Sequence, residues 1–413
     1  MGIGARIYTE LRGDRVIWMI IAVLAMFSIL SVYSATGSLA YKMAGGDTEA
    51  YLLKHSVILG FGLILTYLAY LTHYARFKNA APWLMLITIP LLVFTIAMGP
   101  ELNGARRWIQ IPYVGITFQT SDLAKLTLIL FVAREITKHK DYIQSFEKAF
   151  MPIIVPILMI VALIAPSDLS TALLLFFTCL TMMFIGRIDW KYIALTLILG
   201  IMVFAMLIII GEFAPNFVRV DTWVSRLRDF FAADSGEIGY QVQHSMMAIA
   251  NGDIVGVGPG NSVMRNYLPA PYSDFIYSTI TEEYGLLGAL LILVMYVLLF
   301  FRCVRLVTKS DKSFGGMAAM GITMIIVFQA LANMAVSVNL VPVTGLTLPL
   351  VSMGGTSILF TCVSFGIILS VSKYTEAQSE TDNAMADAVE ARPQPQEKKG
   401  GGNRRRNSRN KEG

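Results

Sequence analysis

Residues 313–372 read SFGGMAAMGITMIIVFQALANMAVSVNLVPVTGLTLPLVSMGGTSILFTCVSFGIILSVS, and these 60 residues include no Asp, Glu, Lys or Arg. One membrane-spanning helix needs roughly 20 mostly apolar residues, so the stretch is too long for a single span. Pro342, Gly345 and Pro349 lie near its middle, and proline and glycine interrupt helices. The stretch therefore predicts two membrane helices joined by a turn.

The composition of the whole chain agrees with a membrane protein. Of its 413 residues, 55% are hydrophobic and 15% are charged, whereas soluble domains have about 25% charged residues. The mean hydropathy is +0.61. A soluble globular enzyme is therefore excluded, and three cysteines make no disulfide framework. The first apolar run is 20 residues long and more runs follow, so we interpret it as a retained span and not a cleaved leader.

Ten apolar runs have a length near that of a membrane span. The fourth run is the weakest candidate, because it is short and contains Asp122 and Lys125. The expected spans are Val16–Ala35, Ser56–Thr72, Ala80–Met98, Ser121–Ala133, Phe150–Ala165, Leu169–Gly186, Tyr192–Ile210, Tyr284–Phe301, Phe314–Val338 and Leu348–Ser372. The predicted fold class is an all-α polytopic membrane protein with about ten transmembrane helices.

The distribution of basic residues predicts the orientation. With the N-terminus inside, 24 of the 33 Lys and Arg residues fall on the inner side, where basic residues concentrate in membrane proteins. We therefore expect both termini in the cytoplasm, with residues 1–15 as the N-terminal segment and 16–373 as the membrane domain. Residues 211–283, between helices 7 and 8, form the longest outside loop. Long loops in compact bundles are usually functional.

Residues 374–413 lack apolar periodicity and end in the basic run KKGGGNRRRNSRNK. This composition predicts a disordered cytoplasmic tail. The basic run favours a position near anionic membrane lipid, and we expect no nucleic-acid binding because a basic run alone is a weak signal.

Charged residues in or beside the spans are the candidates for function, because a charge in hydrocarbon requires a partner or a wet cavity. Asp122 and Lys125 are three residues apart and share a helix face. They form either a structural ion pair or part of an outward-facing polar cavity beside Gln119 and Ser121. Both interpretations stay open at this point.

The outside segment GARRWIQIP contains Arg106, Arg107 and Trp108. Arginine next to tryptophan is typical of a membrane-interface anchor. Guanidinium groups also bind phosphate through paired donors, so a phosphate ligand is the alternative.

The long outside loop carries three further features. Residues 221–231, DTWVSRLRDFF, have the spacing of an amphipathic interfacial helix. Residues 251–262, NGDIVGVGPGNS, are rich in glycine, which permits tight turns. Asp274 precedes an apolar helix start, with Glu282 and Glu283 about two turns later. Asp274 alone fits a helix-start residue, but an acidic trio entering a membrane helix indicates a polar site.

Several ordered motifs together resemble the SEDS family (shape, elongation, division and sporulation). They are GARRWI, FQTSDLAKL, PSDLSTAL, GVGPGNS, LPAPYSDFIYSTITEEYG and PVTGLTLPLVSMGGTS. The resemblance covers about Val16 to Lys373. It implies a ten-span peptidoglycan glycosyltransferase that polymerises lipid II. The VTGLTLP segment is more similar to the division branch of the family than to the elongation branch.

The resemblance also implies roles for particular residues. The essential aspartate of the family corresponds to Asp274, which we expect to be catalytic. The expected substrate-binding residues are Arg106, Arg107, Gln119, Ser121, Asp122, Lys125, Glu282 and Glu283. The chain departs from the family pattern at Thr120, Asp122, His244 and Met353. Asp122 keeps the carboxylate on a shorter side chain, so its role is less affected than that of His244.

The implied reaction fits the chemistry of these residues. An inverting glycosyl transfer needs a base that deprotonates the incoming hydroxyl, and Asp274 is the expected base. The charge of the pyrophosphate leaving group calls for Arg106, Arg107 or Lys125, with a divalent cation (Mg or Mn) as a further option.

The resemblance further implies partners and a location. It implies lipid II, membrane lipid, a class B penicillin-binding transpeptidase and other divisome membrane proteins, at the septum of the bacterial cytoplasmic membrane. The alternatives are an elongation member of the family, a lipid II flippase and a non-catalytic scaffold.

Overall fold

The computed structural model describes residues 13–37, 48–101, 106–110, 117–213, 219–232, 239–309 and 313–390. The expected N-terminal segment up to residue 12 and the basic run at the C-terminal end lie outside these residues. The described residues up to Thr375 form one unit, and a second unit begins at Glu376.

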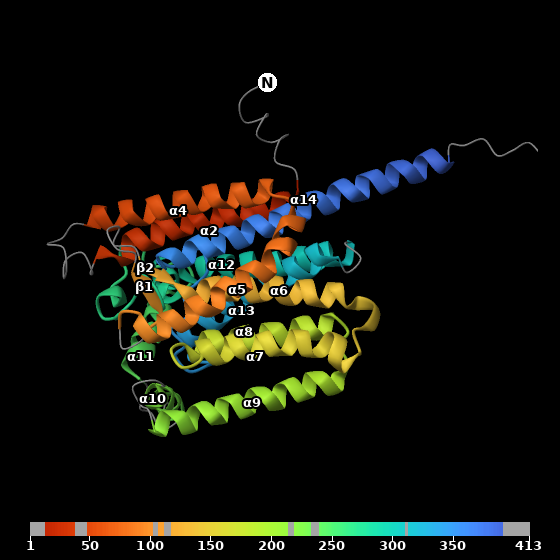
Figure 1. Cartoon of the computed structure of the whole chain (residues 1–413). Coiled ribbons are helices and arrows are strands. Elements are labelled where there is room, and N and C mark those ends of the chain that lie inside the picture. Colours follow the sequence, from red (N-terminus) through yellow and green to blue (C-terminus); the bar gives the residue numbers. More distant parts are fainter. Residues whose placement is uncertain are drawn as a thin grey trace, which may run out of the picture. The chain divides into compact units, whose positions relative to one another are not determined.

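Within the described ranges, the elements are helices except for two short paired strands, and Figure 1 shows their order along the chain. They are α2 (Arg15–Ala35), α4 (Thr48–Leu71), α5 (Tyr74–Met98), β1 (Trp108–Gln110), β2 (Thr117–Gln119), α6 (Thr120–Lys138), η1 (Lys140–Tyr142), η2 (Phe146–Phe150), α7 (Met151–Ile164), α8 (Leu169–Ile185), α9 (Trp190–Phe213), α10 (Val220–Ala232), α11 (Tyr240–Gly252), η4 (Met264–Asn266), α12 (Ile276–Lys309), α13 (Phe314–Ser337) and α14 (Thr356–Glu390). β1 pairs with β2 in antiparallel register, with Trp108 opposite Gln119.

Each of the ten predicted apolar runs overlaps a helix of the structure. Within the described ranges, eight helices are long and apolar enough to cross a membrane. The other two are α8, which is apolar but shorter, and α6, which carries Asp122 and Lys125. The prediction of an all-α polytopic membrane protein is therefore confirmed at the level of the fold.

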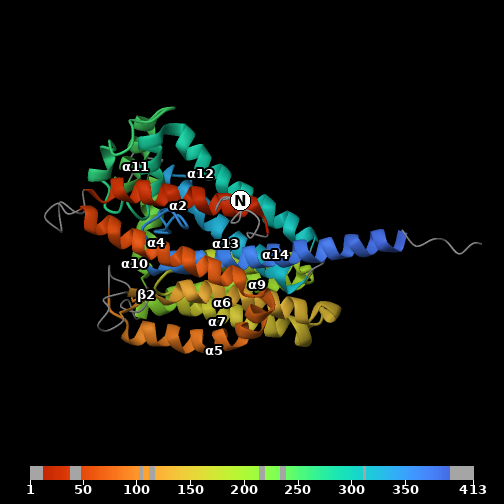
Figure 2. The same ribbon diagram turned by 90° about the horizontal axis from the view of Figure 1, so that it is seen from above.

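Helix α13 occupies the centre of the membrane unit. It contacts α5, α6, α8, α11 and α12, and it is buried along most of its length. Figures 1 and 2 show the long helices of the unit around it, and α9 lies at the lower margin in Figure 1. Glycine and alanine are frequent in α13, and small residues allow close approach of neighbouring helices in membranes. This explains why a helix without charged residues is the core of the unit.

Both boundaries of the last helix differ from the predictions. The last span begins at Thr356 and not at Leu348, because the turn between α13 and α14 extends through Leu350 and Gly355, both at positive φ. At the other end, α14 continues to Glu390, whereas we predicted disorder from residue 374. Residues 374–390 are rich in Ala and Glu, which favour helix, and an existing helix extends without a new nucleation step.

The described part of the predicted loop 211–283 is largely helical. It contains α10, α11 and the first turns of α12. The predicted amphipathic segment 221–231 forms most of α10. Helix α12 has a non-helical residue at Gly285 (φ 67°, ψ −168°), so the expected span start at Tyr284 marks a kink and not the beginning of the helix.

The glycine-rich segment packs against this kink. Val257 N–H donates to the carbonyl of Glu282 (3.0 Å), and Gly258 N–H donates to the carbonyl of Glu283 (3.0 Å). Gly256 has φ +90°, and a Cβ on it would lie 2.2 Å from the carbonyl oxygen of Glu283. The close approach of two backbones, together with the left-handed conformation, explains glycine at this position.

We expect Gly256→Ala to destabilise the protein strongly, because the backbone at Glu283 has to move. Gly260→Ala is the matched control: Gly260 also has positive φ (+80°), but nothing lies within 4 Å of its added Cβ. The control should lose about 1–2 kcal/mol from the backbone conformation alone, and Gly256→Ala clearly more. Thermal unfolding in detergent measures both, and equal losses would contradict the packing explanation.

Candidate functional site

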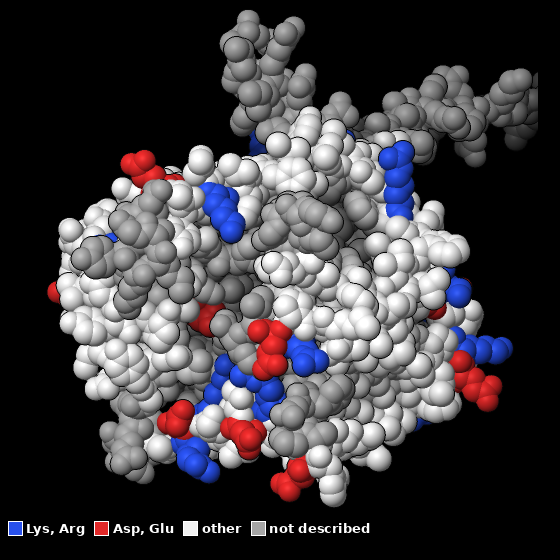
Figure 3. All heavy atoms as spheres, turned by 60° about the vertical axis from the view of Figure 1, so that its left-hand side comes forward, with Lys and Arg blue, Asp and Glu red and all other residues white. Residues whose placement is uncertain are grey.

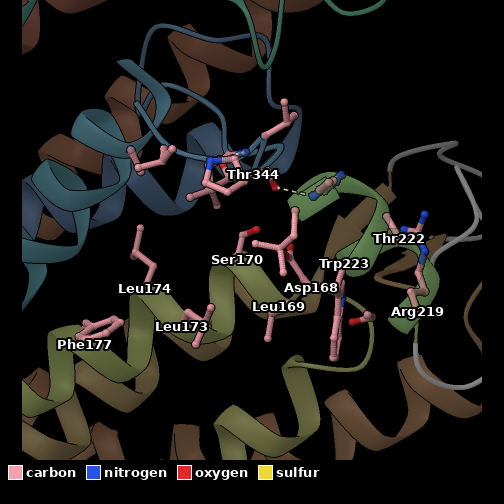
Figure 4. Close-up of a pocket in the computed structure, with 18 of the residues that line it drawn as sticks. Asp168, Leu169, Ser170, Leu173, Leu174, Phe177, Arg219, Thr222, Trp223 and Thr344 are labelled. Carbon is pink, nitrogen blue, oxygen red and sulfur yellow. Dashed lines mark hydrogen bonds between the residues drawn. The ribbon is translucent and has the colours of Figure 1, made fainter. Parts of the chain in front are cut away.

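A large cavity in the described part of the chain has a volume of about 730 Å³. Its walls come from α8, α10, the end of α13 and the segment after α13, together with Arg107 before β1 and Phe204 of α9. Figure 4 shows α8 on one side, presenting Leu173, Leu174 and Phe177, and α10 on another, presenting Thr222 and Trp223. The cavity is large enough for a drug-sized ligand.

One part of the cavity is apolar and lies along the membrane helices. Leu173 and Phe177 of α8, Phe204 of α9 and Phe328 of α13 line it. Phe204 stacks on Trp223 of α10, with ring centroids 5.8 Å apart. This part of the cavity suits a hydrocarbon chain, because its lining lacks charged groups.

The other part of the cavity carries three arginines and one aspartate. Arg107, Arg219 and Arg226 line it together with Asp168. Arg107 Nη1 lies 3.1 Å from Asp168 Oδ2, and both side chains are mostly buried. Asp168 is also the N-cap of α8, where it accepts from Thr171 N–H. Figure 3 faces the end of the molecule with β1, β2, α10 and α11 and shows acidic and basic side chains gathered there.

The three positive charges exceed the one negative charge at this part of the cavity. Partial burial, followed by repulsion from Arg107, lowers the pKa of Arg219. The same two causes lower the pKa of Arg226. Arg226 Nη1 donates to the carbonyl of Thr344 (3.2 Å), and no carboxylate forms an ion pair with it among the described residues. An anionic ligand would relieve this excess of positive charge.

Asp274 lies beside this arginine group, in the turn before α12. Asn333 Nδ2 of α13 donates to the carbonyl of Asp274 (2.7 Å). The hydroxyl of Ser352 donates to the carbonyl of Ser273 (2.7 Å). The backbone around Asp274 is therefore fixed by the central helix and by the turn between α13 and α14.

The carboxylate of Asp274 and the guanidinium of Arg226 both face Gly345. A Cβ added to Gly345 would lie 3.6 Å from Asp274 Oδ2 and 3.8 Å from Arg226 Nη2. Burial raises the pKa of Asp274, while a hydrogen bond from Ser273 (2.8 Å) and the charges of Arg226 and Arg107 lower it. A partly desolvated carboxylate beside cations has the properties of a general base.

The structure separates the two arginines of the GARRW motif. Arg107 lines the large cavity. The side chain of Arg106 is 52% exposed; it lies 4.0 Å from Glu101 and donates to the carbonyl of Ala97 at 3.5 Å. The sequence alone could not distinguish them, because neighbouring residues of an extended segment point in opposite directions.

The Asp122 and Lys125 pair lies in a different place. Lys125 Nζ is 2.8 Å from Asp122 Oδ1 and 3.2 Å from Gln329 Oε1. The adjacent cavity has a volume of only about 30 Å³. Gln119 Nε2 donates to Ser121 Oγ (2.9 Å). These four predicted residues are grouped together, and none of them lines the large cavity.

Glu282 and Glu283 accept hydrogen bonds from the protein itself. Glu282 accepts from the hydroxyl of Ser262 and from Val263 N–H at 3.2 Å. Glu283 accepts from Ser34 at the end of α2 and lies 3.9 Å from Arg265. Neither lines the large cavity. They connect the glycine-rich segment and α2 to the kinked helix α12.

The match to known proteins decides the family. The family model described as "Cell cycle protein", covering FtsW, RodA and SpoVE, matches residues 14–377.

The chain belongs to the FtsW/RodA/SpoVE family.

This is the SEDS family that the motifs indicated. Similar curated proteins are named "Probable peptidoglycan glycosyltransferase FtsW". The one from Burkholderia thailandensis is 32% identical, over 86% of this chain and 77% of its own length. The one from Coxiella burnetii is 30% identical, over 87% and 96%.

Two solved structures have a similar fold. A chain from "Structural coordination of polymerization and crosslinking by a peptidoglycan synthase complex" has a TM-score of 0.65 and 25% identity, over 88% of this chain and 98% of that chain. The rod shape determining protein RodA of Thermus thermophilus has a TM-score of 0.63 and 23% identity, over 87% and 97%.

The predictions from the sequence assigned no site role to Asp168, Arg219 or Arg226, although all three line the large cavity. The spacing on α10 contained a signal: residues 219, 222, 223 and 226 follow the i, i+3, i+4, i+7 pattern of one helix face. Asp168 carried no such signal, because an aspartate before an apolar helix is typical of an N-cap.

The described residues provide no assigned ligands for the divalent cation (Mg or Mn) that the sequence analysis named as an option. Among the described ranges, no group of three or more His, Cys, Asp or Glu side chains has the arrangement to hold a metal ion.

Proposed function

We propose that this protein is a peptidoglycan glycosyltransferase that polymerises lipid II into β-1,4 glycan strands. One arrangement carries the proposal: an apolar cavity of about 730 Å³ ends at three arginines, and the carboxylate of Asp274 faces one of them across Gly345. A polyprenyl pyrophosphate sugar has three parts that match this arrangement in order. Its lipid matches the apolar cavity, its charged pyrophosphate matches the arginines, and its reacting sugar carbon matches the carboxylate of Asp274. The names of the curated relatives support the same reaction.

The reaction follows from these positions. Asp274 accepts the proton of the incoming sugar hydroxyl, whose oxygen forms a bond to the anomeric carbon. The bond from that carbon to the pyrophosphate oxygen breaks, and the oxygen takes the electron pair. Arg107, Arg219 and Arg226 stabilise the charge that develops on the pyrophosphate. Attack opposite the leaving group inverts the anomeric carbon, which converts the α-linked sugar into a β-linked product.

We also propose a setting for this activity. The similar chain from a peptidoglycan synthase complex belongs to an assembly that coordinates polymerisation and crosslinking, and this supports a class B transpeptidase as partner. The FtsW names of the curated relatives support septal wall synthesis during division. The elongation branch is the alternative, and fluorescence localisation to the midcell or the side wall separates the two.

The experiment for the proposed function is a polymerisation assay. The full chain is reconstituted with lipid II, with and without a candidate class B transpeptidase, and glycan strands are separated by gel. We expect undecaprenyl pyrophosphate and β-1,4 polymer as products. A protein that moves lipid II across vesicles but forms no polymer with any partner would overturn the proposal in favour of a flippase. Partner binding without either activity would favour a scaffold.

Arg107→Ala and Arg106→Ala form a matched pair on adjacent residues. We expect Arg107→Ala to raise KM for lipid II by about 10-fold, since it removes a charged donor to the pyrophosphate. Arg106→Ala should stay within about twofold of wild type, because this side chain is exposed and paired loosely. Initial rates over a range of lipid II concentrations measure both. A larger effect for Arg106 would contradict the placement of the phosphate site.

Ser273→Ala should move the pH profile. The hydrogen bond from Ser273 lowers the pKa of Asp274, so its loss raises that pKa further. The base works only when deprotonated, and activity falls as the pH drops through the pKa. The acid limb of kcat/KM should therefore move to higher pH in Ser273→Ala and stay in place in Ser273→Thr, which keeps the hydroxyl. An unchanged limb would remove Asp274 from the role of base.

A further inference from the structure

A chain of polar side chains crosses the interior of the membrane unit, from α6 to the segment after α13. Asp122 and Lys125 of α6 pair at 2.8 Å, and Lys125 Nζ donates to Gln329 Oε1 of α13 at 3.2 Å. Gln329 Nε2 in turn donates to the carbonyl of Thr347 at 2.8 Å. The first three side chains are mostly buried, and none of them lines the large cavity. Any effect on the site therefore has to pass through the segment at Thr347.

Lys125 determines which way the amide of Gln329 faces. An ammonium group only donates hydrogen bonds, whereas an amide has a donor end and an acceptor end. The amide oxygen therefore turns to Lys125, and the NH2 group turns to the carbonyl of Thr347. Asp122 neutralises the lysine, which a charge in the membrane interior requires. The ion pair thus orients Gln329 without leaving a net charge.

The segment after α13 needs such donors because its buried backbone is not helical. The carbonyl of Leu346 accepts from Asn333 Nδ2 at 2.7 Å, and the carbonyl of Thr347 accepts from Gln329. These two amide side chains are four residues apart and share a face of α13. Gly345, which precedes them in the turn, has φ +71°, and glycine adds no conformational stiffness of its own. The two amides therefore fix the turn from outside.

The same turn holds Arg226. The carbonyl of Thr344, three residues before Thr347, accepts from Arg226 Nη1 at 3.2 Å. A Cβ added to Gly345 would lie 3.8 Å from Arg226 Nη2 and 3.6 Å from Asp274 Oδ2. Displacement of the turn would therefore move the guanidinium relative to the carboxylate. A misplacement of about 1 Å at a reacting centre can cost about 100-fold in rate.

We propose that Gln329 is a positioning residue, which the Asp122 and Lys125 pair orients and which keeps Arg226 in place by holding the turn at Thr347. The inference rests on the proposed function and deepens it, because it gives the polar residues of α6 a role without substrate contact. A positioning residue acts on kcat through Arg226, whereas a residue that binds lipid II directly acts on KM.

A double-mutant cycle with Arg226 tests this role. Gln329→Leu keeps the approximate size of the side chain and removes the amide. We expect it to lower the single-turnover rate with saturating lipid II by about 10-fold and to leave KM within about twofold of wild type. In the Arg226→Ala background, the same substitution should change the rate by less than about twofold, since no guanidinium is left to position. Equal losses in both backgrounds would overturn the proposal.

Two further variants test the orienting pair and the specificity of the effect. Asp122→Asn combined with Lys125→Met removes both charges together, so no unpaired charge remains buried, and it should lower the rate as Gln329→Leu does. A raised KM with unchanged kcat would show direct substrate binding and overturn the proposal. Thr323→Val is the matched control, because it removes another buried hydrogen bond of α13, to Cys303, and should leave the rate near that of wild type.

Amide hydrogen exchange of the full chain in nanodiscs gives a readout that needs no polymerisation. We expect the N–H groups of residues 343–348 to exchange about 3- to 10-fold faster in Gln329→Leu, the effect of one lost hydrogen bond, and at the wild-type rate in Thr323→Val. This pattern in a protein that forms no polymer even as wild type would reject the proposed function alone. Polymer from wild type with unchanged kcat in Gln329→Leu would reject the positioning role alone, whatever the exchange rate.

Discussion

Purified Asp274→Asn protein should polymerise lipid II at least about 100-fold more slowly than wild type, because positioned general bases contribute about 10²–10⁴-fold to rate. Asparagine keeps the size and the backbone contacts of Asp274 with Asn333, so folding and membrane level should not change. The substitution removes the carboxylate that accepts the proton. Gel separation of glycan strands after reconstitution with the transpeptidase partner measures the loss.

Asp221→Asn is the control for this variant. Asp221 is an exposed residue in the first turn of α10 and does not line the large cavity. Asp221→Asn changes the same functional group on the same outside segment as Asp274→Asn, and it should leave the rate near that of wild type. If Asp274→Asn retained activity, the base would have to be another group.

The same variant separates the proposed enzyme from its rivals. A flippase moves lipid II without breaking a covalent bond, so Asp274→Asn would leave its transport intact. A scaffold acts through binding, so the variant would leave partner recruitment and wall synthesis intact. Loss of polymer with normal partner binding is therefore the result expected of the glycosyltransferase.

Arg226→Ala should have the second largest effect, a decrease of about 100-fold in kcat. Arg226 lines the large cavity, and Asp274 Oδ2 and Arg226 Nη2 face the same glycine. Removing one donor that stabilises developing negative charge costs about 10²–10³-fold in typical enzymes. Single-turnover rates with saturating lipid II measure this loss apart from weaker binding.

Two further variants test whether the position and shape of the Arg226 side chain matter or only its charge. Arg226→Lys keeps the charge without the planar pair of donors and should recover part of the rate. Arg228→Ala removes an exposed arginine two residues further along α10, which does not line the large cavity, and should behave as wild type. A similar loss for Arg228→Ala would show that the total charge of α10 matters and not the position of Arg226.

Parts of the site could be predicted from the sequence. Asp274 and Arg107 were expected in the site because the resemblance to the SEDS family implied it. On the residues alone, Asp274 also fitted a helix-start residue and Arg107 an interface anchor. Arg219 and Arg226 were not selected. Their helix resembled an interfacial amphipathic helix, and the same pattern of apolar and basic residues occurs when a helix covers a cavity.

The other residues that were expected to bind substrate do not line the large cavity. Glu282 and Glu283 follow Asp274 closely in sequence, but they bond to the segments around Ser262 and Ser34. Asp122 and Lys125 are polar residues of a membrane helix, yet they pair with each other, and Lys125 donates to Gln329 beside a cavity of about 30 Å³. Nearness along the chain and polarity did not indicate which cavity each side chain reaches, so their predicted role in substrate binding stays a prediction.

An all-α membrane protein with about ten apolar helices could be predicted from the sequence alone, because hydrocarbon solvent requires long apolar runs whose backbone groups are satisfied within a helix. The place of the candidate site depends on the tertiary structure. Arg107, Asp168, Arg226 and Asp274 are distant along the chain, and they meet because the segment after α13 offers the carbonyl of Thr344 to Arg226 and leaves Gly345 without a side chain between the guanidinium and the carboxylate. That meeting depends on helix packing, which no local pattern encodes.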